Sequence, residues 1–175
     1  MFGSEVNFDY IELKIHDDYQ LPRFGTGSWT VQGGAFVNKT NLRLLEYKYF
    51  RGSDLFFFSD PNASFQLLDR VFLTPNAYYR GNYVHSFNGM FFNKIPLLNR
   101  LKLNELAGSA LIAIPSEHFI HQEIFVGFQK QIRIKKQLFR LGVFAVTSDS
   151  NVDKANYTFK FGISYWNTYT KKWSF

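Results

Sequence analysis

The amino-acid sequence predicts an all-β fold, an antiparallel up-and-down meander of about seven strands. The clearest strand spans residues 156–165, where every odd position is a large apolar or aromatic residue and every even position is polar or glycine. Successive side chains of a strand point to opposite faces, so this alternation produces one apolar face and one polar face. Aromatic residues, which favour strands and membrane interfaces, make up 19% of the chain.

Two strands are predicted in the N-terminal part of the chain. Residues 5–16 alternate, but the apolar parity changes between Tyr10 and Ile11, which predicts a β-bulge or a change in the surroundings of the strand. A polar turn over 17–27 then leads into a second alternating strand over 28–37.

Residues 38–76 form the least regular part of the chain. They contain short apolar runs separated by Gly, Pro, Asn and Asp, without a firm strand. A long connection of this kind is usually functional or disordered, and its apolar content argues against disorder. We therefore expect it to pack against the rest of the chain.

The C-terminal half returns to alternation, in strands separated by polar or proline-containing connections. The predicted strands span 77–92, 101–114, 118–128, 138–147 and 156–165, and the connections between them span 93–100, 115–117, 129–137 and 148–154. In the strand over 101–114, Glu105 lies on one face, and the opposite, apolar face carries Leu106, Ala110, Ile112 and Ile114.

The polar faces of these strands carry small and neutral residues with a few single charges, namely Glu105, Glu123, Arg140 and Lys160. A soluble barrel exposes a densely charged outer face, whereas a membrane barrel turns its apolar face to lipid and its other face to a polar lumen. About ten residues are also what a tilted strand needs to cross a bilayer. The pattern therefore favours a transmembrane β-barrel.

Composition narrows the possible classes of function. The 175-residue chain has no cysteine, which excludes a disulfide framework, a thiolate zinc site and a cysteine nucleophile. Its net charge of +6 fits either an anionic partner or an ordinary solvated surface. No run approaches the length of a membrane helix, and residues 1–5 do not resemble a signal peptide. Because outer-membrane proteins need export, we expect the chain to be a fragment of a longer protein.

Patterns for catalysis and metal binding are weak. His118 and His121 are three residues apart on a predicted strand, which places them on opposite faces. The acidic loop over 149–153 lacks the glycine and the distal glutamate of a calcium loop. No nucleophile motif or phosphate-binding glycine loop occurs. The sequence predicts no enzyme, no cofactor and no metal, and no nucleic-acid partner because the aromatic residues keep strand parity beside few basic neighbours.

The C-terminus carries a further pattern. Tyr165, Trp173 and Phe175 keep the odd, apolar parity of the last strand. A terminal phenylalanine after an alternating strand is similar to the C-terminal signal of bacterial outer-membrane barrels.

Further stretches carry a resemblance to a known family: YFRGS (49–53), FFSDP (57–61), SFQLL (64–68), HSFNG (85–89) and NKIPLLNRLKLNELAG (93–108). With them, the chain resembles the C-terminal half of the outer-membrane assembly and translocation barrels, the BamA/TamA (bacterial surface antigen) superfamily. It is most similar to an uncharacterised Bacteroidota group in which a carboxypeptidase-regulatory-like N-terminal domain precedes the barrel.

The resemblance implies one barrel segment over 1–175, in the bacterial outer membrane. Residues 38–76 would be a long extracellular loop folding toward the lumen, and the turns at 17–27, 93–100 and 129–137 would face the periplasm. The implied partners are membrane lipid, lipopolysaccharide, the missing N-terminal strands of the parent barrel and other envelope proteins. The parent is expected to insert or translocate outer-membrane proteins or lipids.

The resemblance also implies a lock between the long loop and the lumen. Arg51 and Gly52 match the family's Arg-Gly-aromatic motif, and Arg51 would pair with an inward carboxylate, Glu105 or Glu123. Breaking a desolvated pair of this kind is costly, so it would hold the loop in place. Ser53 stands where the family has an aromatic residue, which is a departure from the motif.

A second function stays open from the residues alone. A soluble β-barrel could hold a hydrophobic ligand inside its aromatic face. A chain that is monomeric without detergent and retains a lipid would favour this alternative.

Overall fold

The computed structural model describes residues 7–69, 71–152, 154–169 and 172–174, and this part of the chain is all-β. Its long strands are β1 (Asn7–Leu21), β2 (Gly25–Asn41), β6 (Tyr78–Ser86), β7 (Leu103–Ile114), β8 (Phe119–Ile134), β9 (Gln137–Ser150) and β10 (Asn156–Asn167). Its short strands are β3 (Lys48–Arg51), β4 (Phe57–Phe58), β5 (Val71–Thr74) and β11 (Lys172–Ser174). Its helical turns are η1 (Leu44–Glu46), η2 (Phe92–Lys94), α1 (Pro96–Asn99) and η3 (Pro115–Glu117). None of the described helices is long and apolar enough to cross a membrane.

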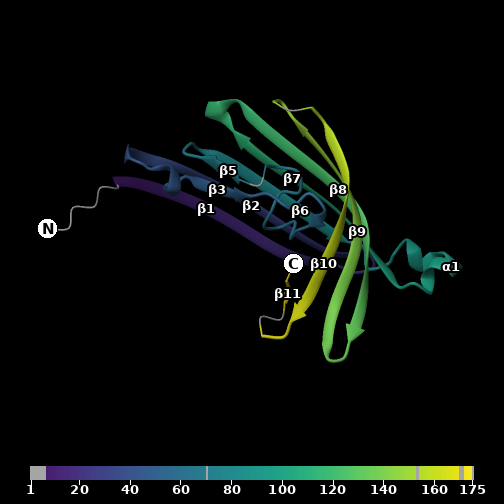
Figure 1. Cartoon of the computed structure of the whole chain (residues 1–175). Coiled ribbons are helices and arrows are strands. Elements are labelled where there is room, and N and C mark those ends of the chain that lie inside the picture. The colour runs from purple at the N-terminus through teal and green to yellow at the C-terminus, as the bar shows by residue number, and fades with distance from the viewer. Residues whose placement is uncertain (1–6, 70, 153, 170–171, 175) are drawn as a thin grey trace.

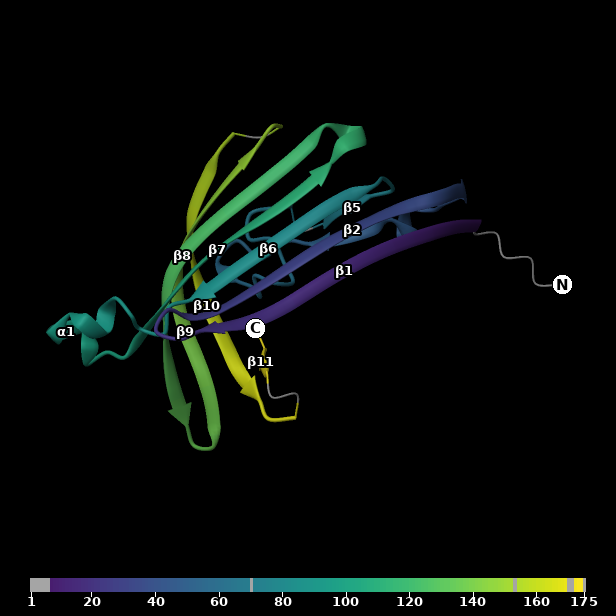
Figure 2. The same ribbon diagram turned by 180° about the vertical axis from the view of Figure 1, so that it is seen from behind.

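The strands form one main sheet in the order β1-β2-β6-β7-β8-β9-β10-β11, with every neighbouring pair antiparallel. The predicted antiparallel meander is therefore confirmed. β4 joins the edge of β10 in parallel, and β3 pairs with β5 in a separate sheet. Figures 1 and 2 show the main sheet as curved and open, and β1 at one edge does not pair with β10 at the other. The expected barrel is thus not closed within the described residues.

Two predicted connections are largely strand in the structure. The turn expected over 17–27 is reduced to 22–24, and the basic connection expected over 129–137 is reduced to Lys135 and Lys136. Polar side chains do not stop a strand whose backbone pairs with a neighbour, so alternation of apolar residues underestimates its length. Lys135 has a positive φ of 54°, which suits the tight turn between β8 and β9.

The irregularity predicted in the first strand lies slightly earlier than expected. The register of β1 against β2 shifts on both sides of Asp9, so the bulge precedes the parity change at Tyr10 and Ile11.

The outer face of the sheet is apolar and exposed along every long strand. Taking one side chain from each strand in spatial order, the exposed residues are Ile11, Val31, Tyr79, Leu111, Ile124, Leu141 and Phe161. Cross-strand partners in a sheet share a face, so the register places them on one continuous surface. This surface is the apolar face that the alternation predicted for most of the strands.

The inner face, in contrast, is buried and carries both polar and apolar side chains. One row across the sheet joins Thr30, Asn82, Ala110, Glu123 and Ser148, and all of them are buried. The chain between β2 and β6, residues 42–77, covers this face, and we refer to it as the inner segment. Figure 1 shows it against one side of the sheet, running from β2 toward β10.

The faces of β7 are the reverse of the prediction. Leu106, Ala110 and Ile112 lie on the inner face, and Glu105 lies on the outer face, because it pairs with Phe128 whereas Ala110 pairs with Glu123. The inner side of β7 is apolar because it is the floor under the inner segment. Two buried clusters form there, one of Phe50, Phe65, Leu68, Tyr78, Ala110, Ile112 and Ile114, the other of Phe58, Leu106, Phe125, Phe144 and Val146.

Candidate functional site

The central feature of the inner face is a buried carboxylate that binds the backbone of the inner segment. Glu123 on β8 is 1% exposed. One of its oxygens, Oε2, accepts a hydrogen bond from the backbone N–H of Gln66 at 2.5 Å, and Oε1 accepts from those of Leu67 at 2.6 Å and Leu68 at 3.0 Å. His121 Nε2 lies 2.9 Å from the same Oε1. Successive backbone N–H groups that converge on one anion form a strong, charge-assisted site.

A buried lysine binds the backbone carbonyl of the same residue, Gln66. Lys160 on β10 is 1% exposed, and its Nζ donates to the backbone carbonyl of Gln66 at 2.5 Å and to that of Asp54. Gln66 therefore presents its N–H to a negative side chain of β8 and its carbonyl to a positive side chain of β10. Two buried charges of opposite sign are satisfied through one segment of backbone, which limits the desolvation cost of each.

Side chains of β6 bind a second part of the inner segment. Asn82 Nδ2 donates to the carbonyl of Pro61 at 2.9 Å, and Arg80 Nη2 donates to the carbonyl of Asn62 at 3.2 Å. The Arg80 guanidinium also lies over the ring of Phe65, 5.1 Å from its centroid. Phe65 is fully buried, so this cation–π contact is shielded from water.

A third contact connects the start of the inner segment to β1. Lys48 Nζ lies 2.5 Å from Glu12 Oε2, which also accepts hydrogen bonds from the hydroxyls of Tyr10 and Tyr78. The Tyr78 hydroxyl in turn accepts from Gln32 Nε2 at 3.0 Å. β1, β2 and β6 thus share one hydrogen-bonded network with the segment.

Aromatic packing completes the attachment at β10. Phe58 of β4 stacks on Phe144 of β9, with ring centroids 3.8 Å apart, while its neighbour Phe57 pairs with Phe161 on the outer side of the edge. The inner segment therefore contacts the sheet from its first strand to its last long strand.

The residues proposed as a lock are not brought together as a set. Arg51 is exposed, and among the described residues no ion pair joins it to Glu105 or Glu123. Glu105 lies on the opposite face from the inner segment, where its Oε1 accepts from the backbone N–H of Phe92 at 2.6 Å. Of the two candidate carboxylates, only Glu123 contacts the segment, and it binds backbone N–H groups.

The Arg-Gly-Ser stretch has a structural part in this arrangement. A Cβ on Gly52 would lie 2.5 Å from the carbonyl oxygens of Leu68 and Asp69, so only glycine fits the close backbone approach there. Ser53, in place of an aromatic residue, is buried and donates through Oγ to the carbonyl of Phe57 at 2.5 Å. The stretch therefore shapes the turn that leads into β4.

The C-terminal signal residues are divided between the faces. Tyr165 is exposed on the outer face of β10. Trp173 lies on β11, which pairs antiparallel with the end of β10 and places Trp173 opposite Trp166. The Arg140 guanidinium lies over the Trp173 ring, with its carbon 3.7 Å from the ring centroid. This reversal after Asn167 ends the odd parity that the sequence suggested. Phe175 lies outside the described residues.

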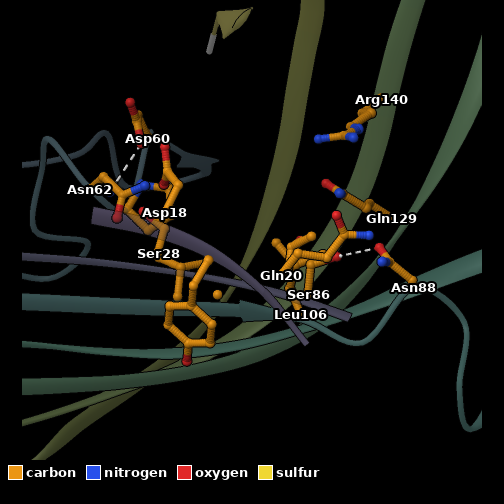
Figure 3. A pocket seen from close by; sticks show the side chains of 15 residues that line it. Asp18, Gln20, Ser28, Asp60, Asn62, Ser86, Asn88, Leu106, Gln129 and Arg140 are labelled. Atoms are coloured by element: carbon orange, nitrogen blue, oxygen red, sulfur yellow. Dashed lines mark hydrogen bonds between the residues drawn. The ribbon is translucent and has the colours of Figure 1, made fainter. Parts of the chain in front are cut away.

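Below the inner segment, a pocket of about 420 Å³ remains on the inner face. Figure 3 shows Asp18, Ser28, Asp60 and Asn62 on one side of it and Arg140 on the other. Its lining combines charged, amide and hydroxyl side chains with the apolar side chains of Val84 and Leu106.

Sequence reasoning identified Glu123 and Lys160 as single charges on polar strand faces but missed their common partner, Gln66. The described residues contain no group of three or more His, Asp or Glu side chains arranged to hold a metal ion. The pattern that could have revealed the site is the presence of isolated charges of opposite sign on the inner face, which require a partner when buried.

Comparison with known proteins gives one relationship. No curated protein and no solved structure matches the chain, so similarity to the BamA/TamA barrels stays a prediction. A family model described as "Family of unknown function (DUF5686) C-terminal domain" matches residues 1–128. Because this match covers more than half of the sequence, the chain belongs to that uncharacterised family.

Proposed function

We propose that this chain is the C-terminal segment of a transmembrane β-barrel in the bacterial outer membrane. The observation that carries the proposal is the contrast between the two faces of the sheet. Apolar side chains such as Ile124 and Phe161 are more than half exposed on the outer face, whereas the inner face buries Glu123 and Lys160. Lipid on the outer face would remove the apolar side chains from water, and the inner segment would occupy the lumen.

The parent protein, in this proposal, inserts or translocates outer-membrane proteins or lipids, as the resemblance to the BamA/TamA superfamily implies. The inner segment supports this direction because it is a long connection that folds into the curve of the sheet and is bound there at several points. The open edges of the sheet belong to strands that pair with the remainder of the parent barrel, since lipid does not tolerate unpaired strand edges.

The first test is the behaviour of the chain without a membrane. We expect the purified chain to aggregate in detergent-free size exclusion and to give a β-type circular dichroism spectrum only after transfer to detergent or lipid. A soluble monomer with a cooperative thermal transition would instead mean that the apolar surface is covered within the protein, as in a soluble ligand-binding barrel.

The role of the parent is tested in the bacterium that carries the gene. Deletion of the parent gene should lower the amounts of other barrel proteins in the outer-membrane fraction, or change its lipid composition, when both are measured quantitatively. If neither the amounts of barrel proteins nor the lipid composition changes, the proposed insertion or translocation role is contradicted. The proposed membrane location is not affected by that result.

A further inference from the structure

Three connections lie at the same end of the main sheet, because successive turns of an antiparallel meander alternate between its two ends. They are the turn at 22–24, the excursion over 87–102 that contains η2 and α1, and the end of the β8–β9 hairpin at 130–137. Figures 1 and 2 show α1 projecting beyond the sheet at this end. We refer to these three connections together as the basic end.

The basic end carries positive charge without acidic residues. Its basic side chains are Arg23, Lys94, Arg100, Lys102, Lys130, Arg133, Lys135 and Lys136, and none of the three stretches contains Asp or Glu. Of the connections at the opposite end, 42–69 contains both signs of charge, and 115–118 contains an acidic residue, Glu117, without Lys or Arg. Among the described residues, Lys94, Arg100 and Lys102 have no ion-pair partner. The positive charge is therefore concentrated at one end of the molecule and available to an outside partner.

Large apolar side chains are interleaved with these charges and are also exposed. Phe24 follows Arg23 and is 57% exposed, Ile134 precedes Lys135 and is 54% exposed, and Leu97 on α1 is 78% exposed. Alternating apolar and basic side chains on one surface are typical of segments that lie in the headgroup region of a membrane.

The excursion is held beside the outer face of the sheet. Phe92 packs against Phe128 of the outer face, with centroids 6.1 Å apart, and its backbone N–H donates to Glu105. α1 therefore leaves the sheet at the border of the apolar surface, where lipid chains would give way to headgroups.

From this arrangement we propose that the basic end binds the headgroups of anionic phospholipids, such as phosphatidylglycerol, in the leaflet that it faces. The proposal rests on the membrane location proposed above. Phosphate groups would be bound by Lys94, Arg100 and the basic hairpin, while Leu97 and its apolar neighbours enter the upper part of the acyl region. The mixture of exposed apolar side chains with charge favours a lipid over a nucleic acid, whose backbone would leave Leu97 and Phe24 in water.

The test measures binding of short-chain phosphatidylglycerol and of short-chain phosphatidylcholine to the full chain folded in non-ionic detergent. The double variant Lys94→Gln, Arg100→Gln is compared with Lys39→Gln, Lys154→Gln, which removes two charges outside the basic end. Each basic residue near a membrane surface accounts for roughly a fivefold effect, so we expect the first variant to bind phosphatidylglycerol about 25-fold more weakly and the second to be unchanged.

Equal binding of the two lipids, or equal weakening in both variants, would overturn the inference. Preferential binding of lipopolysaccharide, or displacement of the lipid by a DNA oligonucleotide at comparable concentration, would overturn the choice of phospholipid. All these readings use protein with a β-type circular dichroism spectrum in detergent, so they leave the proposed membrane location standing. A different result, a soluble monomer in detergent-free size exclusion, would contradict the membrane location itself.

Discussion

At the scale of single residues, the inner face depends on two buried charges that both bind the backbone of Gln66, one at its N–H and the other at its carbonyl oxygen. Glu123 and Lys160 are each 1% exposed and lie on different strands, β8 and β10. Neither charge would be tolerated in that environment without its backbone partners. The two side chains can consequently be buried only when the inner segment is in place, and they in turn hold the segment there.

Replacing Glu123 by Gln should therefore destabilise the folded chain. Glutamine keeps the shape but replaces one carboxylate oxygen by an NH₂ group, which cannot accept a hydrogen bond from the backbone N–H donors. Loss of one partner from a buried ionic arrangement costs about 3–5 kcal/mol. Urea unfolding followed by tryptophan fluorescence, in the lipid or detergent that supports the fold, measures the difference. Glu46→Gln, at an exposed position of the same segment, serves as the control and should change stability little; equal effects of both variants would contradict this account of the site.

Gly52 gives a second prediction at this scale. An alanine Cβ would lie 2.5 Å from two carbonyl oxygens, so Gly52→Ala must displace the backbone around Leu68. We expect a loss of about 1–3 kcal/mol and faster proteolysis within the inner segment. Gly81→Ala is the matched control, because a Cβ there meets nothing within 4 Å. If Gly52→Ala and Gly81→Ala resist proteolysis equally well, the absence of a side chain at position 52 is not required for the inner segment to pack.

At the scale of elements, alternation predicted which strands exist and their order, because their backbones follow one another in a meander. It failed on β7, where the apolar side chains Leu106, Ala110 and Ile112 face the inner segment. A period of two identifies two faces but not which one is covered, and here an intervening segment inverted the usual relation. The short strands β3, β4 and β5 could not be predicted, since each exists through pairing with distant residues.

The candidate site was predictable only in part for the same reason. A single charge on a polar strand face pointed to Glu123, but its partners are backbone N–H groups, which every residue possesses and no sequence pattern distinguishes. Arg51 illustrates the converse: the motif drew attention to the side chain, whereas the structure shows a steric role for the neighbouring Gly52.

The pairing of β4 with β10 leads to a prediction about this edge of the sheet. A completed barrel would place another strand along β10, so β4 and that strand would compete for the same backbone groups. Because the chain has no cysteine, Phe57→Cys with Phe161→Cys gives a clean pair for a short thiol cross-linker. We expect cross-linking in the chain alone and its loss when the N-terminal strands of the parent are folded with it. Phe57→Cys with Val31→Cys on β2 should not cross-link, and persistence of the first cross-link in the complete parent would mean that β4 belongs to the barrel wall.

At the scale of the whole molecule, the environment of the outer face decides between a membrane protein and a soluble one. The structure places exposed apolar side chains on the outside and the buried charges of Glu123 and Lys160 inside, which is the opposite of a soluble carrier of hydrophobic ligands. The basic end adds direction, because one end of the sheet carries concentrated positive charge and the other does not.

A charge on the outer face distinguishes these environments by the sign of its effect. Phe161 lies within β10 and is 55% exposed, so Phe161→Arg places a guanidinium where lipid would be. In a membrane barrel this substitution should make folding into lipid vesicles less favourable by about 2–4 kcal/mol, with the largest loss of stability near the bilayer centre. Tyr169→Arg, in the exposed turn after β10, is the control and should fold into the vesicles with the same stability as the unsubstituted chain. If the face is instead exposed to water, Phe161→Arg removes an apolar side chain from solvent and should raise solubility without loss of stability, which separation of folded and unfolded protein after urea titration would reveal.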